Sequence, residues 1–498
     1  MACAGGWAPL RLACNRADAG NLQLTNYFGF PMKRLVLCFD GTWNAIADPK
    51  TVTNVVRLAN MVTVSTTDGT DQISYYNSGV GSGGPLDRFL GGAFGAGLKS
   101  NVKRGLAFLA LNYEEGDEIY LFGFSRGAYT ARALAGIVGA AGIPLDISRT
   151  ELHWQLYQRF AKLRPKERKL KRKGNSPELE AVEKEMATIR QQLHDLSRNE
   201  DKPVPITCVG VWDTVGSYGV PGGFSGLSHA FTYWVRGFRD TQIGKAVKLG
   251  LHAVAIDEMR RPFSPTFWTL RPGMALQAQE VEQMWFPGVH SNVGGGYDRT
   301  GLSDMALAWM IARVAEKTGL EFNPSAVLEN VWPCSACTIY RTSYGRPFGK
   351  SRIVLPRLPS TLIGRAWHAT RRFFGLEPRV QSMRVNEEVH WSVQERCGWD
   401  TALVDGRGAL KYSPPNLVSP PAYSEMLELE RMLVDRNHVS EGLPAGLRKY
   451  SEPFDVAAAL AKRNADWDSH CSLQQANLKC QCKERYASAA PAGQSRAA

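Results

Sequence analysis

The chain has 498 residues, enough for one large α/β domain with insertions or for two or three smaller domains. Hydrophobic residues make up 44% of it and charged residues 21%, as in an ordinary globular protein, and no apolar run reaches the roughly 18 residues of a membrane-spanning helix. The 59 basic and 47 acidic residues give a net charge of +12, which favours contact with anionic surfaces such as phospholipid, nucleic acid or acidic protein.

The two ends of the chain differ from the rest. Residues 1–31 lack the basic start and apolar core of a secretory signal, so we expect a flexible arm on a cytoplasmic protein. Residues 486–498 are mostly small, and we expect a disordered tail there. Ordered structure should therefore begin near Met32.

Apolar runs and helical spacings alternate between residues 33 and 142. The predicted elements are strands at 33–44, 72–84 and 117–125 and helices at 51–62, 98–112 and 126–142. Strands that alternate with helices, with loops at the strand ends, indicate a parallel sheet covered on both faces.

A charged helical stretch at 146–203 interrupts this alternation. Ser176 precedes Pro177, the arrangement of a helix N-cap and a first helical residue. A basic run at 162–174 precedes this cap, and apolar residues spaced as in a coiled-coil seam follow it. The seam consists of Leu179, Val182, Met186, Ile189, Leu193 and Leu196. We expect an antiparallel helical hairpin inserted into the sheet domain, either as a solvated arm or as a cap or docking element.

The sheet pattern resumes after the insertion. The predicted elements are strands at 204–217, 265–270 and 281–297 and a helix at 302–319, capped by Ser303 and ended by Gly319. Beyond them the chain is rich in proline and irregular. We therefore expect a mostly parallel α/β domain at 32–325, with the hairpin inside it, and a C-terminal region at 326–485 that packs on this domain.

The segment Gly-Phe-Ser-Arg-Gly at 123–127 follows a strong strand pattern and opens a helical one. Gly123 and Gly127 leave room for a sharp strand-to-helix turn, which would raise Ser125 above the sheet at a helix N-terminus. This is the pattern of a nucleophile elbow. The alternative is that Ser125 is only a small residue in a tight turn, because short glycine patterns also arise by chance.

A serine nucleophile needs a base, and the chain has nine histidines. His290 lies in "PGVHSNVGGGY", where a strand ends in a glycine-rich loop, and such a loop is where this type of fold carries its base. The alternative is that the loop only turns the chain. His390, in "NEEVHWSVQER", is the first rival and His252 is the second.

The base in turn needs a carboxylate that orients it. Asp213 ends the apolar run "CVGVWD", and a carboxylate is costly to bury without a partner. Ser125, Asp213 and His290 then occur in the chain order of α/β-hydrolase triads. Asp304 and Asp257 are the alternates, although helix-capping or surface roles suit them better.

Acyl transfer also needs backbone N–H groups that stabilise the oxyanion. The N–H of Arg126 follows the nucleophile directly, and Gly41 and Thr42 lie just past the first strand in "FDGTWN". The glycine-rich loop at 78–84 is the competing source. We expect Asp40 to hold the first of these loops by hydrogen bonds.

This chemistry implies no cofactor and no metal. Cys334 and Cys337 form one close pair and Cys480 and Cys482 another, but neither pair has the further ligands of a zinc site. We expect buried, reduced thiols instead.

Five strings together resemble a known family: "CFDGTWN", "GFSRGAYTAR", "VGVWDTVGS", "PGVHSNVGGGY" and "LSDMALAWM". They are similar to the α/β-hydrolase family numbered 2235 among domains of unknown function, which includes the catalytic domain of type VI secretion phospholipase effectors. The resemblance covers about residues 33 to 320 and, weakly, 389 to 417. It departs at Asn292, where the family often carries aspartate.

The resemblance implies a serine esterase that acts on lipid or phospholipid acyl esters, with Ser125, Asp213 and His290 at the triad positions. A lipid substrate and an anionic membrane surface are the expected partners, nucleic acid is not expected, and delivery by a secretion system stays open. The alternative is a non-catalytic membrane- or partner-binding protein that retains the fold.

One segment of the C-terminal region, at 360–375, has the layout of a helix that lies in a lipid interface. A helix there would present arginines on one face and apolar residues on the other. The apolar residues are Leu362, Ile363, Ala366, Trp367, Phe373 and Phe374. The alternative is a helix that packs this apolar face on the hydrolase core.

Overall fold

The computed structural model describes residues 32–41, 52–79, 91–198, 204–215, 243–258, 265–270 and 279–335, together with residues 260 and 263 and short stretches between 337 and 466. Several predictions fall outside the described residues: the arm at 1–31, Thr42, the segment at 360–375, Cys480, Cys482 and the tail at 486–498. None of the helices in the described parts of the chain is both long and apolar enough to cross a membrane.

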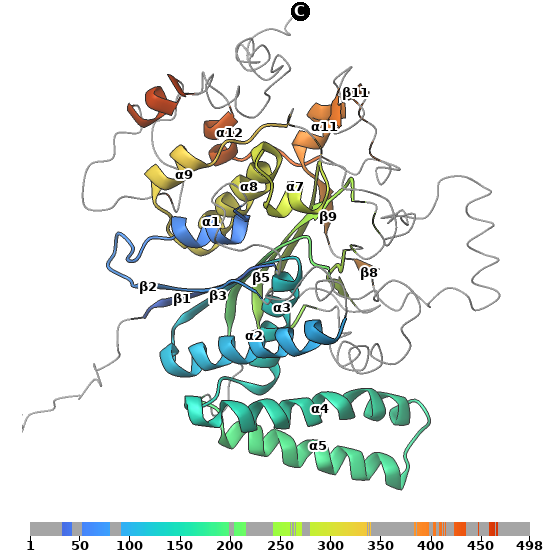
Figure 1. The fold of residues 1–498 in the computed structure, drawn as a ribbon. Coiled ribbons are helices and arrows are strands. Elements are labelled where there is room, and N and C mark those ends of the chain that lie inside the picture. The colour runs from blue at the N-terminus through green and yellow to red at the C-terminus, as the bar shows by residue number, and fades with distance from the viewer. Residues whose placement is uncertain are drawn as a thin grey trace, which may run out of the picture. The chain divides into compact units, whose positions relative to one another are not determined.

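Seven strands form one sheet in the order β2-β1-β3-β4-β5-β7-β9, and every neighbouring pair is parallel (Figure 1). The strands are β1 (Arg34–Phe39), β2 (Gln72–Asn77), β3 (Glu118–Phe124), β4 (Ile206–Trp212), β5 (Val247–Ala255), β7 (Glu280–Phe286) and β9 (Glu387–Val389). The predicted parallel α/β class is confirmed.

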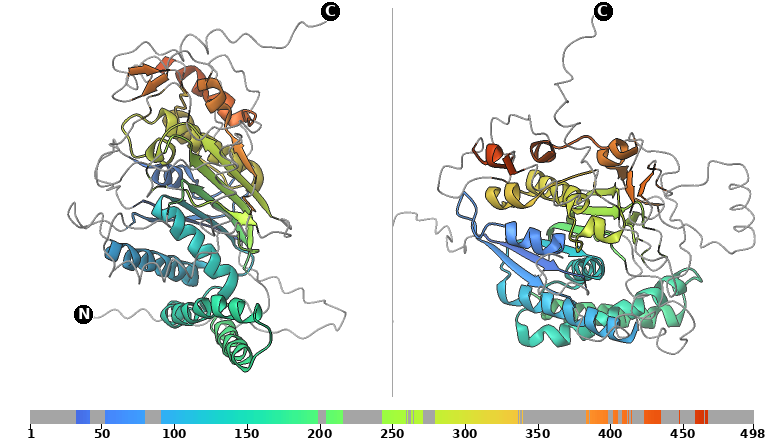
Figure 2. Two further views of the ribbon diagram at one scale, coloured as in Figure 1. Left: turned by 90° about the vertical axis from the view of Figure 1, so that its right-hand side faces the viewer. Right: turned by 45° about the horizontal axis from the view of Figure 1, so that its top comes forward.

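Helices cover both faces of this sheet (Figures 1 and 2). One face carries α2 (Gly91–Asn112) and α3 (Arg126–Ala141), and the other carries α1 (Asn54–Met61) and α8 (Gly301–Thr318). Both faces of a strand must then be apolar, which is why the interior strands appear in the sequence as continuous apolar runs rather than as alternating ones.

Strand β1 shows this double burial. Leu35, Leu37 and Phe39 join the hydrophobic core on the side of α2 and α3, whereas Val36 and Cys38 join the core on the side of α1 and α8. All five side chains are inaccessible to solvent. Two separate hydrophobic cores, one on each face, therefore fix the position of the sheet.

Strand β5 was not predicted. Its nine residues are buried except Lys248, and they pair with β4 on one side and β7 on the other. The prediction of a strand at 265–270 was wrong for most of its length, since only Thr269–Leu270 (β6) is extended in a ladder, antiparallel to Met383–Arg384 (β8) and outside the main sheet. The backbone of Trp268 instead bonds to a side chain: its N–H donates to Gln283 Oε1 at 2.8 Å, and its carbonyl accepts from Gln283 Nε2 at 3.2 Å.

The predicted hairpin is present as α4 (Thr150–Lys171) and α5 (Pro177–Asp195), preceded by the short helix η1 (Ile147–Arg149). The Ser176 hydroxyl accepts the Leu179 N–H at 3.2 Å, as predicted for a cap. Ion pairs join Arg159 to Glu185 and Lys166 to Glu178, so the two helices run antiparallel. The predicted seam is buried from Leu179 to Leu193, and Leu196 is half-buried.

Helix α8 begins earlier than predicted. Its N-cap is Thr300, and Ser303 lies within the first turn, where its hydroxyl donates to the Thr300 carbonyl at 2.8 Å. A serine in the first turn can satisfy its hydroxyl locally, which imitates a cap in the sequence pattern. Gly319 ends the helix as predicted, in the left-handed conformation with φ 75°.

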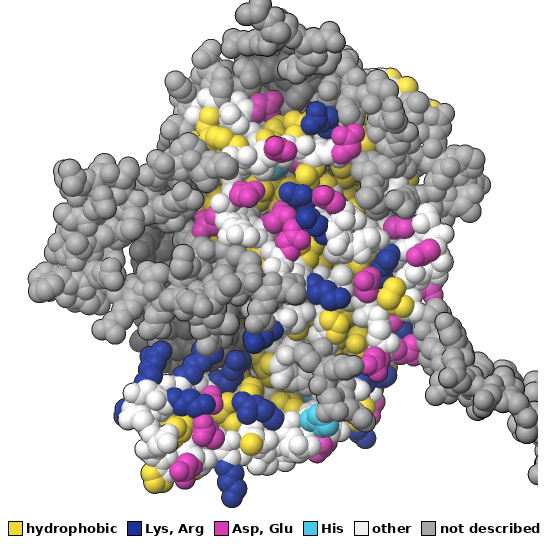
Figure 3. All heavy atoms as spheres, turned by 180° about the vertical axis from the view of Figure 1, so that it is seen from behind, with side chains coloured by type: hydrophobic (Ala, Val, Ile, Leu, Met, Phe, Trp, Pro, Cys, Tyr) yellow, Lys and Arg dark blue, Asp and Glu magenta, His cyan; other side chains and the backbone are white. Residues whose placement is uncertain are grey.

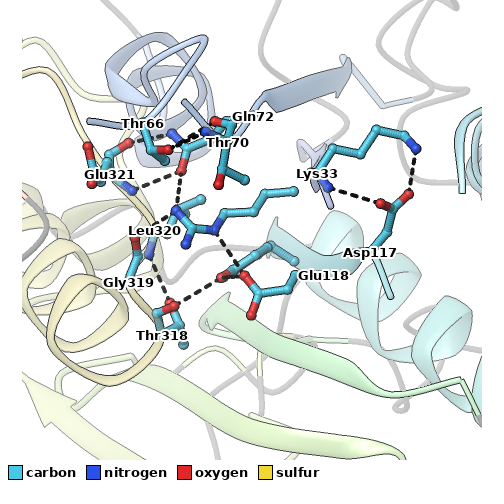
Figure 4. A network of polar contacts seen from close by, with 12 residues as sticks. Lys33, Thr66, Thr70, Gln72, Asp117, Glu118, Thr318, Gly319, Leu320 and Glu321 are labelled. Carbon is cyan, nitrogen blue, oxygen red and sulfur yellow. Dashed lines mark hydrogen bonds and ion pairs between the residues drawn. The ribbon is translucent and has the colours of Figure 1, made fainter. Parts of the chain in front are cut away.

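A polar network closes the amino edge of the sheet (Figure 4). Arg34 donates to Glu118 at 2.9 Å and to the Gly319 carbonyl at 2.9 Å, and Gln72 accepts the Glu321 N–H at 3.0 Å. Lys33 pairs with Asp117 nearby at 2.8 Å. These contacts tie the end of α8 to the first residues of β1, β2 and β3.

Residues beyond 325 contribute to the main sheet through β9, which pairs with β7. The other described elements of this part are short. They are α9 (Pro324–Asn330), α11 (Trp391–Cys397), β10 (Ala402–Val404), β11 (Gly408–Leu410) and α12 (Glu428–Val434). Leu429 and Leu433 of α12 belong to the same hydrophobic core as α8.

Candidate active site

Ser125 lies between the last residue of β3 and the first residue of α3, with φ 58° and ψ −117°. A non-glycine residue with this backbone is uncommon and is held only where the surroundings impose it. Here a Cβ on Gly123 would lie 2.5 Å from the Gly127 carbonyl, and a Cβ on Gly127 would lie 2.0 Å from the Phe39 carbonyl oxygen. The turn is therefore tight on both sides of the serine.

The structure brings Ser125, His290 and Asp213 together from three elements. The His290 Nε2 atom lies 2.8 Å from Ser125 Oγ, and its Nδ1 atom lies 2.6 Å from Asp213 Oδ2. Because a carboxylate only accepts, Nδ1 carries the proton and Nε2 accepts from the serine hydroxyl. The three side chains form one continuous hydrogen-bonded chain across sequence separations of 165 and 77 residues.

Asp213 follows β4 and is 1% exposed. Burial raises the pKa of its carboxyl group, and the hydrogen bond with His290 opposes that rise. Its second oxygen, Oδ1, accepts the Ala255 N–H at 3.2 Å. The residue has φ 37°, a left-handed conformation that aspartate tolerates better than most side chains do.

His290 is the first residue of a short helix, α7 (His290–Gly294), rather than part of an extended loop. The ring stacks 4.6 Å from the ring of Phe124 and meets the ring of Phe263 edge-on at 4.9 Å. Its backbone N–H donates to Glu258 Oε2 at 3.2 Å. The imidazole is thus fixed by contacts on several sides as well as by its two hydrogen bonds.

Glu258 and Arg260 were missed by the sequence analysis because they follow the unpredicted strand β5. Glu258 is 4% exposed and accepts two hydrogen bonds from the Arg260 guanidinium, at 2.9 Å and 2.8 Å. Burial lowers the pKa of Arg260, but the bonds to Glu258 outweigh this effect and the pKa is raised overall. The apolar run from Val247 to Ala255 is the sequence signal that could have located them.

The loop after β1 is held by Asp40, as predicted. Its carboxylate accepts from Thr53 Oγ1 at 2.7 Å, from Tyr76 Oη at 2.8 Å and from the Gly41 N–H at 2.6 Å. The Gly41 amide is therefore engaged by Asp40. Gly79, in the competing loop, lies against the same segment, since a Cβ on it would be 2.8 Å from the Gly41 carbonyl oxygen.

The two rival histidines have other partners. The His390 ring is buried and lies 2.7 Å from Glu430 Oε1 and 2.7 Å from Ser392 Oγ. His252 accepts the Thr214 N–H at 3.1 Å, and burial lowers its pKa to about 3, so it is neutral. Neither ring has a contact with Ser125 among the interactions of the described residues.

The alternate carboxylates also have structural partners. Asp304 bonds to Arg57, to the Thr300 hydroxyl at 3.1 Å and to the Trp332 N–H at 2.7 Å. Asp257 accepts from the Gly288 N–H at 2.7 Å and from the Tyr412 hydroxyl at 2.8 Å. Both anchor chain segments around α8 and α7.

The described part of the chain contains no group of three or more histidine, cysteine, aspartate or glutamate side chains arranged to hold a metal ion. Cys334 and Cys337 are buried thiols.

The parallel sheet and the serine on a strained strand-to-helix turn define the α/β-hydrolase class. The chain belongs to the family described as "T6SS, Phospholipase effector Tle1-like, catalytic domain", whose model matches residues 33–313. The predicted family resemblance is thereby confirmed.

The chain is also similar to individual proteins, at low sequence identity. The chain is 28% identical over 261 residues to "Uncharacterized protein YEL023C" of Saccharomyces cerevisiae, which covers 48% of this chain and 33% of that protein. It is also similar to an uncharacterized protein from Pseudomonas aeruginosa, with 17% identity, a TM-score of 0.35 and coverage of 57% and 45% of the two chains. The Tle1 effector bound to the VgrG spike gives 15% identity, a TM-score of 0.24 and 56% coverage of each chain.

Proposed function

We propose that the protein is a serine hydrolase that cleaves carboxylic esters of phospholipids through an acyl-enzyme. The observation that carries this proposal is the hydrogen-bonded chain from Ser125 through His290 to Asp213. A serine hydroxyl is unreactive alone and becomes a nucleophile when an oriented base accepts its proton. The strained elbow supports the same role, because backbone strain of this kind concentrates at functional sites.

In the proposed reaction, His290 Nε2 takes the proton of Ser125 as Oγ attacks the ester carbonyl carbon. The tetrahedral intermediate collapses, the bond to the alcohol oxygen breaks, and His290 gives the proton to the leaving alcohol. Water then repeats the sequence on the acyl-enzyme and releases the fatty acid. Asp213 accepts from Nδ1 throughout and stabilises the imidazolium form.

The oxyanion is proposed to bind at two backbone amides. One is the N–H of Arg126, the first residue of α3. The other is proposed to come from the loop after β1, in which the Gly41 N–H donates to Asp40 and the next residue in the sequence, Thr42, lies outside the described residues. Burial lowers the pKa of the Arg126 guanidinium to about 10, so this side chain, which follows the nucleophile in the sequence, stays charged near neutral pH.

The substrate class is proposed from the family, whose description names phospholipase effectors. The chain spans about a third of the length of the curated relative it matches, so the activity and partners of that whole protein are not transferred. The rival function is a non-catalytic protein that binds a membrane or a partner and retains the fold. The hydrogen bonds that join Ser125, His290 and Asp213 favour the hydrolase over this non-catalytic function.

The proposal is tested by replacing Ser125 with alanine and measuring hydrolysis of p-nitrophenyl esters and of diacyl phospholipids. We expect the wild-type protein to hydrolyse both and Ser125→Ala to lose about a millionfold of kcat, as nucleophile removal does in serine proteases. The melting temperature should stay nearly unchanged. A fluorophosphonate probe should label the wild-type protein covalently, and labelling that persists in Ser125→Ala would refute the assignment.

A further inference from the structure

The guanidinium of Arg260 lies close to the proposed base. It stacks 3.8 Å from the centre of the Phe263 ring, and the same ring lies 4.9 Å from the His290 imidazole. Glu258 joins the two residues by a second route, since it accepts from the His290 backbone and from the Arg260 side chain. Arg260 is therefore one side chain away from the reacting serine–histidine pair.

Among the described residues, one edge of this guanidinium is held by hydrogen bonds. Nε and Nη2 donate to the two oxygens of Glu258. Within the part of the chain that the structure describes, no group accepts a hydrogen bond from Nη1. The Arg260 side chain is 11% exposed, so it is mostly buried but retains access to solvent.

We propose that Arg260 binds the phosphate group of the lipid substrate through Nη1 and the outer face of its guanidinium. This inference deepens the proposed function and rests on it for the position of the ester. In a glycerophospholipid, a few covalent bonds separate the phosphate from each acyl ester, so an ester at Ser125 places the phosphate within the reach of a neighbouring side chain. A planar guanidinium matches phosphate oxygens in geometry and in charge.

The surroundings of Arg260 suit this role. Glu258 fixes the guanidinium from one side and Phe263 from its face, so little side-chain entropy is lost when a ligand binds. The same contacts hold it at one position relative to His290. The phosphate would then select lipids that carry a phosphodiester over neutral lipids with the same acyl chains.

The competing explanation is that the pair of Glu258 and Arg260 only holds the His290 segment in place. A binding experiment in the Ser125→Ala background separates the two explanations, because no substrate is consumed. Calorimetry would measure the affinity for dihexanoyl phosphatidylcholine and for dihexanoylglycerol, which shares its acyl esters but lacks the phosphate. Arg260→Gln and Arg260→Lys are compared with Arg104→Gln, an exposed arginine on α2.

We expect Arg260→Gln to weaken phosphatidylcholine binding at least about tenfold, since hydrogen bonds to charged groups contribute this much. Arg260→Lys should lie between this variant and the wild type, and Arg104→Gln should match the wild type. The affinity for dihexanoylglycerol should be the same in all of them. Inorganic phosphate should compete with phosphatidylcholine only weakly, which identifies the lipid rather than the free ion as the ligand.

If Arg260→Gln lost the same affinity for both lipids, the proposal would be overturned, because Arg260 would then only hold the His290 segment in place. Phosphatidylcholine binding that does not depend on Arg260 would overturn it as well, and so would the absence of binding to the Ser125→Ala protein. Failure of the proposed function has a different signature. In that case the wild-type protein would hydrolyse neither lipid, although selective binding of the phospholipid could still depend on Arg260.

Discussion

At the scale of single residues, the site depends on close backbone approaches as much as on its polar side chains. Gly127 lets α3 begin directly against the end of β1, and this contact sets the height of Ser125 above the sheet. No other residue type fits there without movement of the backbone. The glycines of the elbow are therefore as specific a requirement as the serine.

We expect Gly127→Ala to destabilise the protein by about 1–3 kcal/mol, because its Cβ would lie 2.0 Å from the Phe39 carbonyl oxygen. The forced shift should also displace Ser125 and lower kcat. Gly136→Ala is the matched control, since it lies in the same helix and its Cβ would meet no atom within 4 Å. That change should be neutral or should stabilise the protein by up to about 1 kcal/mol. Urea denaturation and ester hydrolysis measure both effects, and equal behaviour of the two variants would contradict this account.

Asp213→Asn should lower kcat by about ten-thousand-fold, the loss seen for the same change in a serine protease, because an amide can favour the wrong imidazole tautomer. Asparagine tolerates the left-handed backbone at this position, so the fold should be retained. Steady-state hydrolysis of a p-nitrophenyl ester measures the effect. Asp304→Asn provides the comparison, and it should reduce the melting temperature through its lost bonds to Arg57 and Trp332 without a comparable loss of kcat. If Asp304→Asn lost the activity and Asp213→Asn lowered only the melting temperature, Asp304 rather than Asp213 would be the carboxylate that orients the base.

At the scale of elements, β5 is the strand that joins the two halves of the site. Asp213 follows β4 and Glu258 follows β5, so both lie at the carboxyl edge of the sheet. His252, in the middle of β5, links its neighbours, since it accepts the Thr214 N–H after β4 and lies 3.4 Å from the Gln283 amide oxygen on β7. Its imidazole must stay neutral to accept the Thr214 N–H.

This neutral histidine should make the fold sensitive to acid. Its pKa is about 3 in the folded state and roughly 6.5 in the unfolded chain, so only the unfolded chain binds its proton between these values. Its contribution to stability is complete above pH 6.5 and is lost as the pH falls toward 3. Between pH 7 and pH 5 the loss should be about 2 kcal/mol. Urea denaturation of the wild-type protein and of His252→Gln should show a smaller pH effect in the variant, and an unchanged effect would show that another group is responsible.

At the scale of the whole molecule, the helical hairpin concentrates positive charge. Eight of the twelve residues from Lys162 to Lys173 are lysine or arginine, and one is acidic. Figure 3 shows dark blue side chains gathered on the hairpin, at the bottom of the view. Basic residues in the last turn of α4 stabilise the helix through its dipole. The basic residues of this run are more numerous than those in the last turn, so the helix dipole does not account for all of them.

We expect the hairpin to attract vesicles of phosphatidylcholine mixed with phosphatidylglycerol, at about 1 kcal/mol for each basic residue near the surface. A variant with glutamine at four exposed positions should lose most of this binding in a sedimentation assay. These positions are Lys162, Lys169, Arg172 and Lys173. The control variant removes four exposed charges outside the hairpin, at Arg104, Lys248, Lys317 and Lys462. If both variants lost the same amount of binding, net charge rather than the hairpin would be the cause.

The sequence by itself determined the elements whose pattern is local. The buried strands β1, β3 and β4, the cap at Ser176 and the elbow glycines each depend on neighbours within a few residues, and all were predicted. The sequence also limited the candidates for the base, because only a few histidines follow an apolar run. It did not reveal β5, and the strand predicted at 265–270 was wrong for most of its length, since both are short apolar stretches and periodicity alone does not show which one has partners.

Only the tertiary structure decided which side chains meet. His290 contacts Ser125 across 165 residues because β3, β4, β5 and β7 are neighbours in the sheet and end at the same edge. His390 also follows a strand at that edge, but β9 is the outermost strand, and there the ring is bound to Glu430. Glu258 and Arg260 became visible only once β5 placed them beside His290. Strand order is set by the burial of both faces of the sheet, which is a property of the assembled cores and not of any single segment.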